Sequence, residues 1–209
     1  MQIKKNRTAT MQLHKRLLFL IILFFSANCQ AQLLPDEPIR FHKDYSENGL
    51  VFGSITFPEA KMKFDGYVLW IKRLEDGKWK SFGKIYLEPQ PFKRKHNGEI
   101  DQGRTYLFAF EKPPGQYDIP MLRLVALKVM YDGRDNDLTG FSIPFEVIKG
   151  EITYIGNINI NEYATKGEPI ITLEDNFIKD KNSLKNLQKM VNWEAAVKSK
   201  LELNTTSGQ

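Results

Sequence analysis

Residues 135–140, followed by Glu146, have the spacing of a calcium-binding loop. Counted from Asp135, oxygen-bearing side chains fall at positions 1, 3 and 5, glycine at 6 and glutamate at 12, the pattern of an EF-hand. The flanks 125–131 and 141–148 are typical of strands rather than helices, and Pro144 lies inside the loop. The segment is therefore either a calcium loop or an acidic hairpin loop, and the weak metal candidates are Asp135, Asp137, Thr139 and Glu146.

Two histidines, His42 and His96, lie beyond residue 31, and neither has a second histidine nearby. A histidine metal site or a Ser-His-Asp triad would have to use one of them as its sole base. The basic run 93–98 could contact phosphate or anionic lipid, or it could be a solvated turn.

The 25 acidic residues offer many carboxylate pairs, but none lies in a motif that selects it for acid–base catalysis. The glycine-rich phosphate-binding spacings are also absent. The sequence therefore assigns no catalytic and no cofactor-binding residue, and no cofactor is expected.

Short β-branched and aromatic runs between glycines and prolines predict a mainly β fold, an antiparallel β-sandwich of about eight strands over 48–173. Thirteen of the 14 glycines lie between Gly49 and Gly167. We expect strands at 49–57, 66–74, 79–87, 104–111, 121–130, 141–148, 152–160 and 169–173.

Period-two alternation predicts which side chains share a face. Tyr106, Phe108 and Phe110 should face one way, and in the later strand Ile152, Tyr154, Ile158 and Ile160 should do so, with Gly156 indicating a bulge. The pairs Asp76-Gly77 and Lys149-Gly150 predict turns between strands.

Residues 174–202 predict one amphipathic helix packed on the sandwich, with a possible break near Asn182 and Asp175 or Asn176 as its cap. The segment contains no glycine or proline. The proposed apolar stripe and Trp193 fit the core better than a surface for a partner helix; the stripe is Leu184, Leu187, Val191, Val197 and Leu201.

Residues 1–31 have the layout of a secretory signal, with a basic stretch followed by nine apolar residues, 17–25. Cleavage before Gln32 would release a soluble protein. In the alternative, 26–29 is similar to a lipobox and Cys29 becomes acylated. Either Met1 or Met11 could be the start.

The formal charge of +5 belongs to this leader, which holds five basic residues and no acidic one. Subtracting those five from the 30 lysines and arginines leaves 25 basic residues against 25 acidic ones. The chain is 42% apolar and its body is neutral, which excludes disorder, a nucleic-acid-coating surface and a polytopic membrane protein. We expect 32–47 to be a linker and 203–209 a frayed tail.

Three segments resemble uncharacterised bacterial envelope lipoproteins with a prealbumin-like or carboxypeptidase regulatory-like β-sandwich. They are 108–119, with its Pro-Pro-Gly-x-Tyr turn, 141–147 and 150–158. The resemblance implies that the last two form a hairpin, and it spans about 48–195. The families it resembles have no assigned reaction.

The leader and the resemblance together predict an exported protein of the periplasm, outer membrane or medium. We expect a non-enzymatic binding or structural module whose partner is an envelope protein or glycan, with no nucleic acid. It would meet a membrane only through a lipid on Cys29. The alternatives are a carbohydrate- or peptide-active enzyme that uses paired carboxylates, and a calcium-binding module.

Overall fold

The structure is a computed structural model that describes residues 38–87, 89, 94–126 and 136–205. The leader with Cys29, the Gln32 cleavage point, Lys93 of the basic run and Asp135 lie outside the described residues, as do 206–209. None of the described helices is long and apolar enough to cross a membrane.

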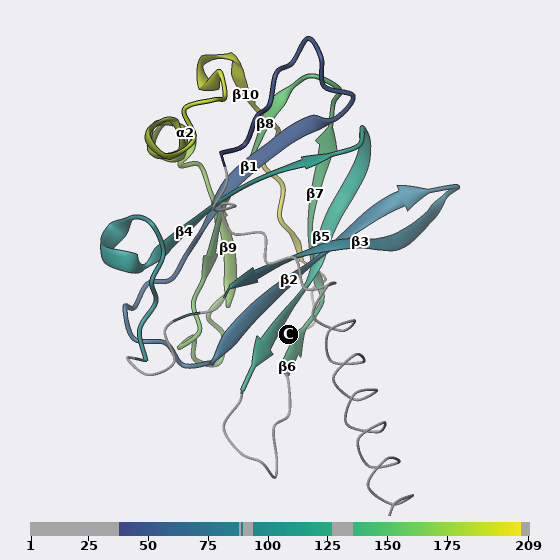
Figure 1. The fold of residues 1–209 in the computed structure, drawn as a ribbon. Helices are drawn as coiled ribbons and strands as arrows, with labels where there is room; N and C mark the ends of the chain where they lie inside the picture. Colours follow the sequence, from purple (N-terminus) through teal and green to yellow (C-terminus); the bar gives the residue numbers. More distant parts are fainter. Residues whose placement is uncertain (1–37, 88, 90–93, 127–135, 206–209) are drawn as a thin grey trace, which may run out of the picture. The chain divides into compact units, whose positions relative to one another are not determined.

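The described strands form two sheets, which confirms the mainly β sandwich (Figure 1). The first sheet has the order β10-β8-β1-β4, and β9 also pairs with β8. Its strands are β1 (Gly49–Thr56), β4 (Thr105–Lys112), β8 (Ile152–Ile160), β9 (Ile171–Glu174) and β10 (Ala196–Lys198).

The second sheet has the order β11-β7-β5-β2-β3, and β6 also pairs with β5. Its strands are β2 (Gly66–Glu75), β3 (Lys78–Leu87), β5 (Gly115–Val125), β6 (Asn136–Leu138), β7 (Phe141–Val147) and β11 (Asn204–Thr205). Strand β5 thus begins earlier than the expected 121–130 strand and ends at Val125.

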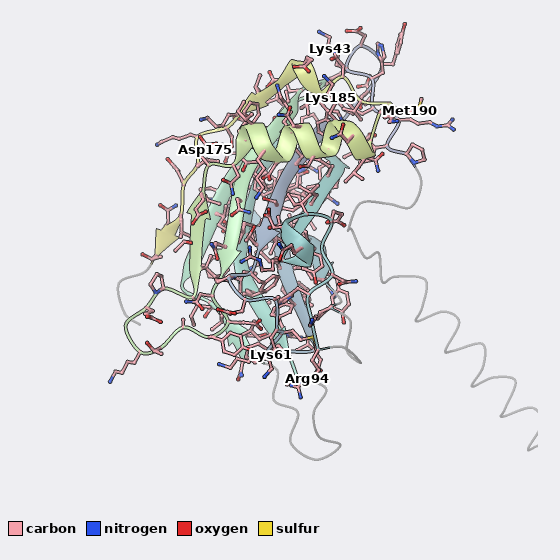
Figure 2. The ribbon with its side chains drawn as sticks, turned by 90° about the vertical axis from the view of Figure 1, so that its left-hand side faces the viewer. Lys43, Lys61, Arg94, Asp175, Lys185 and Met190 are labelled. Carbon is pink, nitrogen blue, oxygen red and sulfur yellow. The ribbon has the colours of Figure 1, made fainter. Side chains whose placement is uncertain are left out.

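Two apolar clusters hold the layers together. The larger lies between the sheets and includes Tyr106, Phe108 and Phe110, which confirms the face predicted for β4. The smaller lies on the other face of the first sheet, where α2 (Phe177–Leu187) crosses it (Figure 2). Ile39 and Phe41 are buried in this second cluster, so the expected linker packs onto the domain in part.

Gly156 forms the predicted bulge. The β1–β8 pairing advances from Phe52 to Ser54 on β1 but from Tyr154 to Asn157 on β8, so β8 carries one extra residue. The extra residue reverses the side-chain alternation, and Tyr154 joins the smaller cluster while Ile158 joins the larger one. The expectation that Ile152, Tyr154, Ile158 and Ile160 share one face was therefore wrong.

The Asp76-Gly77 turn is confirmed, since β2 and β3 pair up to Glu75 and Lys78 with both turn residues at positive φ. Lys149-Gly150 also turns the chain, with Gly150 at φ 74°. However, β7 and β8 belong to different sheets, so this turn joins the two layers and the implied hairpin does not form.

The helix is shorter than predicted. It ends at Leu187, and the one-turn helix η2 (Trp193–Ala195) and strand β10 follow. The predicted core position of Trp193 is confirmed, but Leu187 and Val197 of the supposed stripe are exposed. Tertiary contacts account for the difference, because Trp193 packs edge-on against Phe52 and β10 pairs with the edge of β8.

The segment after β10 runs from one sheet to the other. Ser199 donates its backbone N–H to the carbonyl oxygen of Tyr154 at 3.1 Å, and Leu203 packs on the core between the sheets. Asn204 and Thr205 then pair with β7, so the first residues of the expected frayed tail are ordered as β11.

Candidate functional site

A groove opens on one side of the sandwich, between β7 of the second sheet and β10 of the first. We call it the side groove. Its volume is about 510 Å³, and it is lined by Trp79, Gln116, Tyr117, Pro144, Phe145, Glu146, Ile148, Glu151, Thr153, Val197, Lys198, Ser199, Lys200 and Glu202.

The edges of the two sheets shape the side groove. Strand β10 is the last in the order of its sheet, and β11 pairs with β7 only at Phe141 and Ser142. Val197 pairs with Thr153, whose partner on β1, Val51, belongs to the core between the sheets. Val197 therefore lies on the inward face of an edge strand, yet 46% of it is exposed.

Three large apolar side chains are exposed at the groove. Trp79 is 47% exposed and Ile148 is 40% exposed, and with Val197 they form three of the eight large hydrophobic residues exposed in the described part of the chain. A second hollow of about 560 Å³ beside 164–171 is lined by none of the eight. Exposed apolar surface of this kind commonly marks an interaction site.

The groove also carries charge of both signs, distributed unevenly. Lys198 pairs with Asp175 at 2.5 Å, and Lys200 pairs with Glu202. In contrast, the carboxylates of Glu146 and Glu151 have no hydrogen bond or ion pair within the described residues. These two acids are the uncompensated charges of the groove.

His96 belongs to a different place, a buried polar cluster at the end of the sandwich. Its Nε2 lies 3.0 Å from Glu162 Oε1, and Glu162 Oε2 accepts hydrogen bonds from the Tyr67 hydroxyl and, at 2.8 Å, from the Lys63 backbone N–H. The ring of His96 stacks on Phe57 with centroids 3.8 Å apart. Burial, followed by the hydrogen bond to Glu162, raises the pKa of Tyr67.

This cluster does not form the triad considered from the sequence. Its partners are a carboxylate and tyrosines, and no serine hydroxyl is bonded to His96 among the described residues. His42 is exposed beside Asp44 at 3.8 Å and stacks on Tyr45. Both members of the His96–Glu162 pair are almost fully buried, and neither lines any of the three hollows of the described surface. The role of the pair is therefore structural: it links two loops of the fold.

A second buried network lies under α2. The carboxylate of Asp180 accepts hydrogen bonds from Ser54 at 2.6 Å and from Tyr154 at 3.0 Å, both through Oδ2. Its Oδ1 is buried without a partner among the described atoms, and so is Oδ1 of Asn157. Burial raises the pKa of Asp180 to about 6, while the hydrogen bonds from Ser54 and Tyr154 lower it. Because Asp180 is fully buried, the network fixes α2 to the sheet.

The structure does not bring together the calcium candidates that it describes, Asp137, Thr139 and Glu146. Asp137 lies opposite Arg123 on β5 and accepts two hydrogen bonds from it, at 2.7 and 2.9 Å. Glu146 lies opposite Gln116 on the same strand. Positions 116 and 123 of β5 are about 23 Å apart at roughly 3.3 Å per residue, whereas ligands of one calcium ion lie within about 5 Å of one another.

Thr139 lies in the short break between β6 and β7, which both run antiparallel to β5, and it lines the second hollow. No group of three or more histidine, cysteine or acidic residues that could hold a metal occurs in the described ranges. Of the three candidates within the described residues, only Glu146 lines the side groove.

The described part of the basic run, residues 94–98, is not a continuous cationic surface. Arg94 and Lys95 are exposed, and Figure 2 shows Arg94 near Lys61 at one end of the sandwich. His96 turns inward to Glu162, and the backbone N–H of Asn97 donates to the Tyr106 hydroxyl at 3.0 Å. Burial raises the pKa of that hydroxyl to about 12.

The sequence reasoning missed the side groove because no local motif carries it. Trp79, Ile148 and Val197 come from three distant parts of the chain. The one available signal was Val197, which was assigned to the apolar stripe of a helix that ends before it.

No family model and no curated protein matches this chain. Similar solved structures include a leucine-rich repeat protein from Bacteroides thetaiotaomicron, 12% identical with a TM-score of 0.32, covering 70% of this chain and 16% of that one. A 9R-lipoxygenase from Cyanothece is 12% identical with a TM-score of 0.26, covering 84% of this chain and 27% of that one. This chain thus spans only a small part of either protein, and likenesses at these TM-scores carry no argument about fold or function.

Proposed function

We propose that this protein is an exported cell-envelope module that binds another envelope component through the side groove and catalyses no reaction. The observation that carries the proposal is the separation of chemistry from accessible surface. His96, Glu162 and Asp180 are buried in networks that hold the fold together, whereas the groove exposes Trp79 and its apolar neighbours. A surface of this composition supports binding.

Export rests on the sequence of residues 1–31 and on the resemblance to envelope lipoproteins. Mass spectrometry of the protein from the soluble and membrane fractions of a bacterial cell tests it. A mature chain that begins at Gln32, or at an acylated Cys29, supports export. A full-length chain in the cytoplasmic fraction contradicts it.

Binding is tested by co-sedimentation of the purified protein with a washed envelope preparation. We expect Val197→Asp to lower the affinity for the envelope about tenfold, the effect of losing roughly 1.4 kcal/mol of binding free energy. Ile178→Asp is the matched control, because Ile178 is 62% exposed on α2 and does not line the groove. If Val197→Asp sediments like the wild-type protein, binding through the groove is excluded.

The rival function is an enzyme that uses two groove carboxylates, for which Glu146, Glu151 and Glu202 are the available acids. Purified peptidoglycan and a mixed peptide substrate are incubated with the protein, and we expect no product above the blank. Product that disappears in Glu146→Gln or Glu151→Gln would establish the enzyme and overturn our proposal.

A further inference from the structure

We infer that the occupant of the side groove is an extended peptide segment with basic and aliphatic side chains, contributed by a partner protein. The inference rests on the proposed function and names the chemistry of the partner. Three features of the groove carry it: its unpaired charges, its exposed aliphatic side chains, and Trp79.

The charge of the groove is complementary to a cation. Lys198 and Lys200, the two lysines that line the groove, are each engaged by a neighbouring carboxylate. The negative charges of Glu146 and Glu151 are left without a partner among the described residues. A ligand that covers these carboxylates must supply positive charge, because covering them with a neutral surface would cost the free energy of their hydration.

The apolar part of the groove fits aliphatic side chains of an extended chain. Val197 and Ile148 are exposed, and Phe145 and Tyr117 of the core lie beneath them as part of the lining. In an extended chain, successive side chains point to opposite sides. Alternating residues can therefore place an aliphatic group against Val197 and a basic group against Glu146 or Glu151.

Trp79 supplies a site for the cation itself. The residue lies at the end of the β2–β3 hairpin, opposite Leu74, and is the most exposed of the three large apolar residues at the groove. The face of an indole ring attracts lysine and arginine more strongly than other aromatic rings do. A neutral glycan could stack on the same ring, but it would leave both carboxylates uncompensated.

The test uses two blocked synthetic hexapeptides, one of alternating leucine and lysine and one of alternating leucine and glutamate, titrated into the full chain by calorimetry. We expect the basic peptide to bind and the acidic peptide to bind at least about tenfold more weakly. Raising the salt from about 0.05 to 0.5 M should weaken binding of the basic peptide, because exposed charges are screened.

Variants locate the site. Glu146→Gln with Glu151→Gln should weaken the basic peptide about tenfold, and Trp79→Ala should weaken it severalfold. Glu111→Gln is the control carboxylate, because Glu111 is exposed on β4, at the opposite edge of the first sheet. Tyr45→Ala is the control aromatic, since Tyr45 is 84% exposed outside the groove.

Equal binding of the two peptides, or loss of binding in the control variants, overturns the peptide assignment. Binding of a soluble peptidoglycan fragment that depends on Trp79, with no binding of the basic peptide, also overturns it and identifies a glycan instead. Both outcomes are compatible with the proposed function as long as Val197→Asp still lowers co-sedimentation with the envelope. If Val197→Asp co-sediments like the wild-type protein, both the proposed function and the peptide assignment are contradicted.

Discussion

His96 Nε2 lies 3.0 Å from Glu162 Oε1 although the two residues are separated by 66 positions, and their side chains are 0% and 1% exposed. The contact joins the loop before β4 to the loop after β8. Glu162 also accepts hydrogen bonds from the Tyr67 hydroxyl and the Lys63 backbone, so three segments of the chain meet at one carboxylate. This carboxylate therefore holds three segments together, and its removal leaves the partly buried Lys63 N–H and the buried Tyr67 hydroxyl without that acceptor.

Replacing Glu162 by alanine is therefore expected to destabilise the protein by about 3–5 kcal/mol, the usual cost of removing one member of a buried, hydrogen-bonded pair. Urea unfolding followed by circular dichroism measures the change. Glu168→Ala, at an exposed residue of the same loop, should change stability by less than about 1 kcal/mol. If the two variants lose similar amounts of unfolding free energy, the buried hydrogen bonds of Glu162 do not stabilise the fold.

The raised pKa of Asp180 predicts that the stability of the protein depends on pH. Burial raises its pKa from 3.8 to about 6, so the folded protein binds a proton more tightly than the unfolded chain does. The unfolding free energy should then fall by roughly 3 kcal/mol as the pH rises from about 3 to about 7, and level off above pH 7, where the carboxyl is ionised in both states.

The variant Asp180→Asn isolates this contribution, because its amide oxygen can still accept from Ser54 and Tyr154 and the side chain cannot ionise. We expect the stability of Asp180→Asn relative to the wild-type protein to increase by about 2 kcal/mol between pH 4 and pH 7. Asp44→Asn, at a side chain 63% exposed, is the control and should change by less than about 0.5 kcal/mol. A constant difference between Asp180→Asn and wild type would refute the titration of Asp180.

The separation of Asp137 from Glu146 predicts that calcium does not stabilise this protein. Thermal unfolding at about 5 mM calcium, above the Kd of roughly 10⁻³ M typical of weak extracellular sites, should match unfolding with chelator. A rise in Tm that disappears in Asp137→Asn would revive the calcium loop. Arg123→Ala should itself cost less than about 1 kcal/mol, since its pair with Asp137 is about one-third exposed.

Alternation and turn chemistry in the sequence were enough to predict the sandwich. The β4 aromatics keep a strict period of two, and Asp76-Gly77 has the residues that a tight hairpin requires. Such signals are local, so they need no knowledge of the partner strand. The strands that were missed, β6, β10 and β11, are two or three residues long and exist only because β5, β8 and β7 offer them an edge.

The helix and the groove show where local signals end. The spacing of Val191, Val197 and Leu201 is helical by coincidence: Val191 is buried, whereas Val197 lies on β10 and is exposed. The side groove likewise depends on how far apart the sheet edges lie, which no spacing in the sequence encodes. The sequence has 25 acidic residues, and nothing in it singles out Glu146 and Glu151. These two differ from the others at the groove because no described residue forms a hydrogen bond or ion pair with their carboxylates, which only the structure shows.

The bulge at Gly156 leads to a final prediction, about its neighbour Gly53. A Cβ atom at Gly53 would lie 2.4 Å from the carbonyl oxygen of Gly156 and 2.7 Å from the ring of Phe108, so β1 and β8 would have to separate. We expect Gly53→Ala to destabilise the protein by at least about 2 kcal/mol, as overpacking against backbone does. Gly66→Ala is the matched strand control, because its nearest neighbour would be 3.5 Å away, in ordinary contact. The stability of Gly66→Ala should stay within about 0.5 kcal/mol of wild type. If Gly53→Ala is equally mild in urea unfolding, β1 and β8 lie farther apart at Gly53 than these distances require.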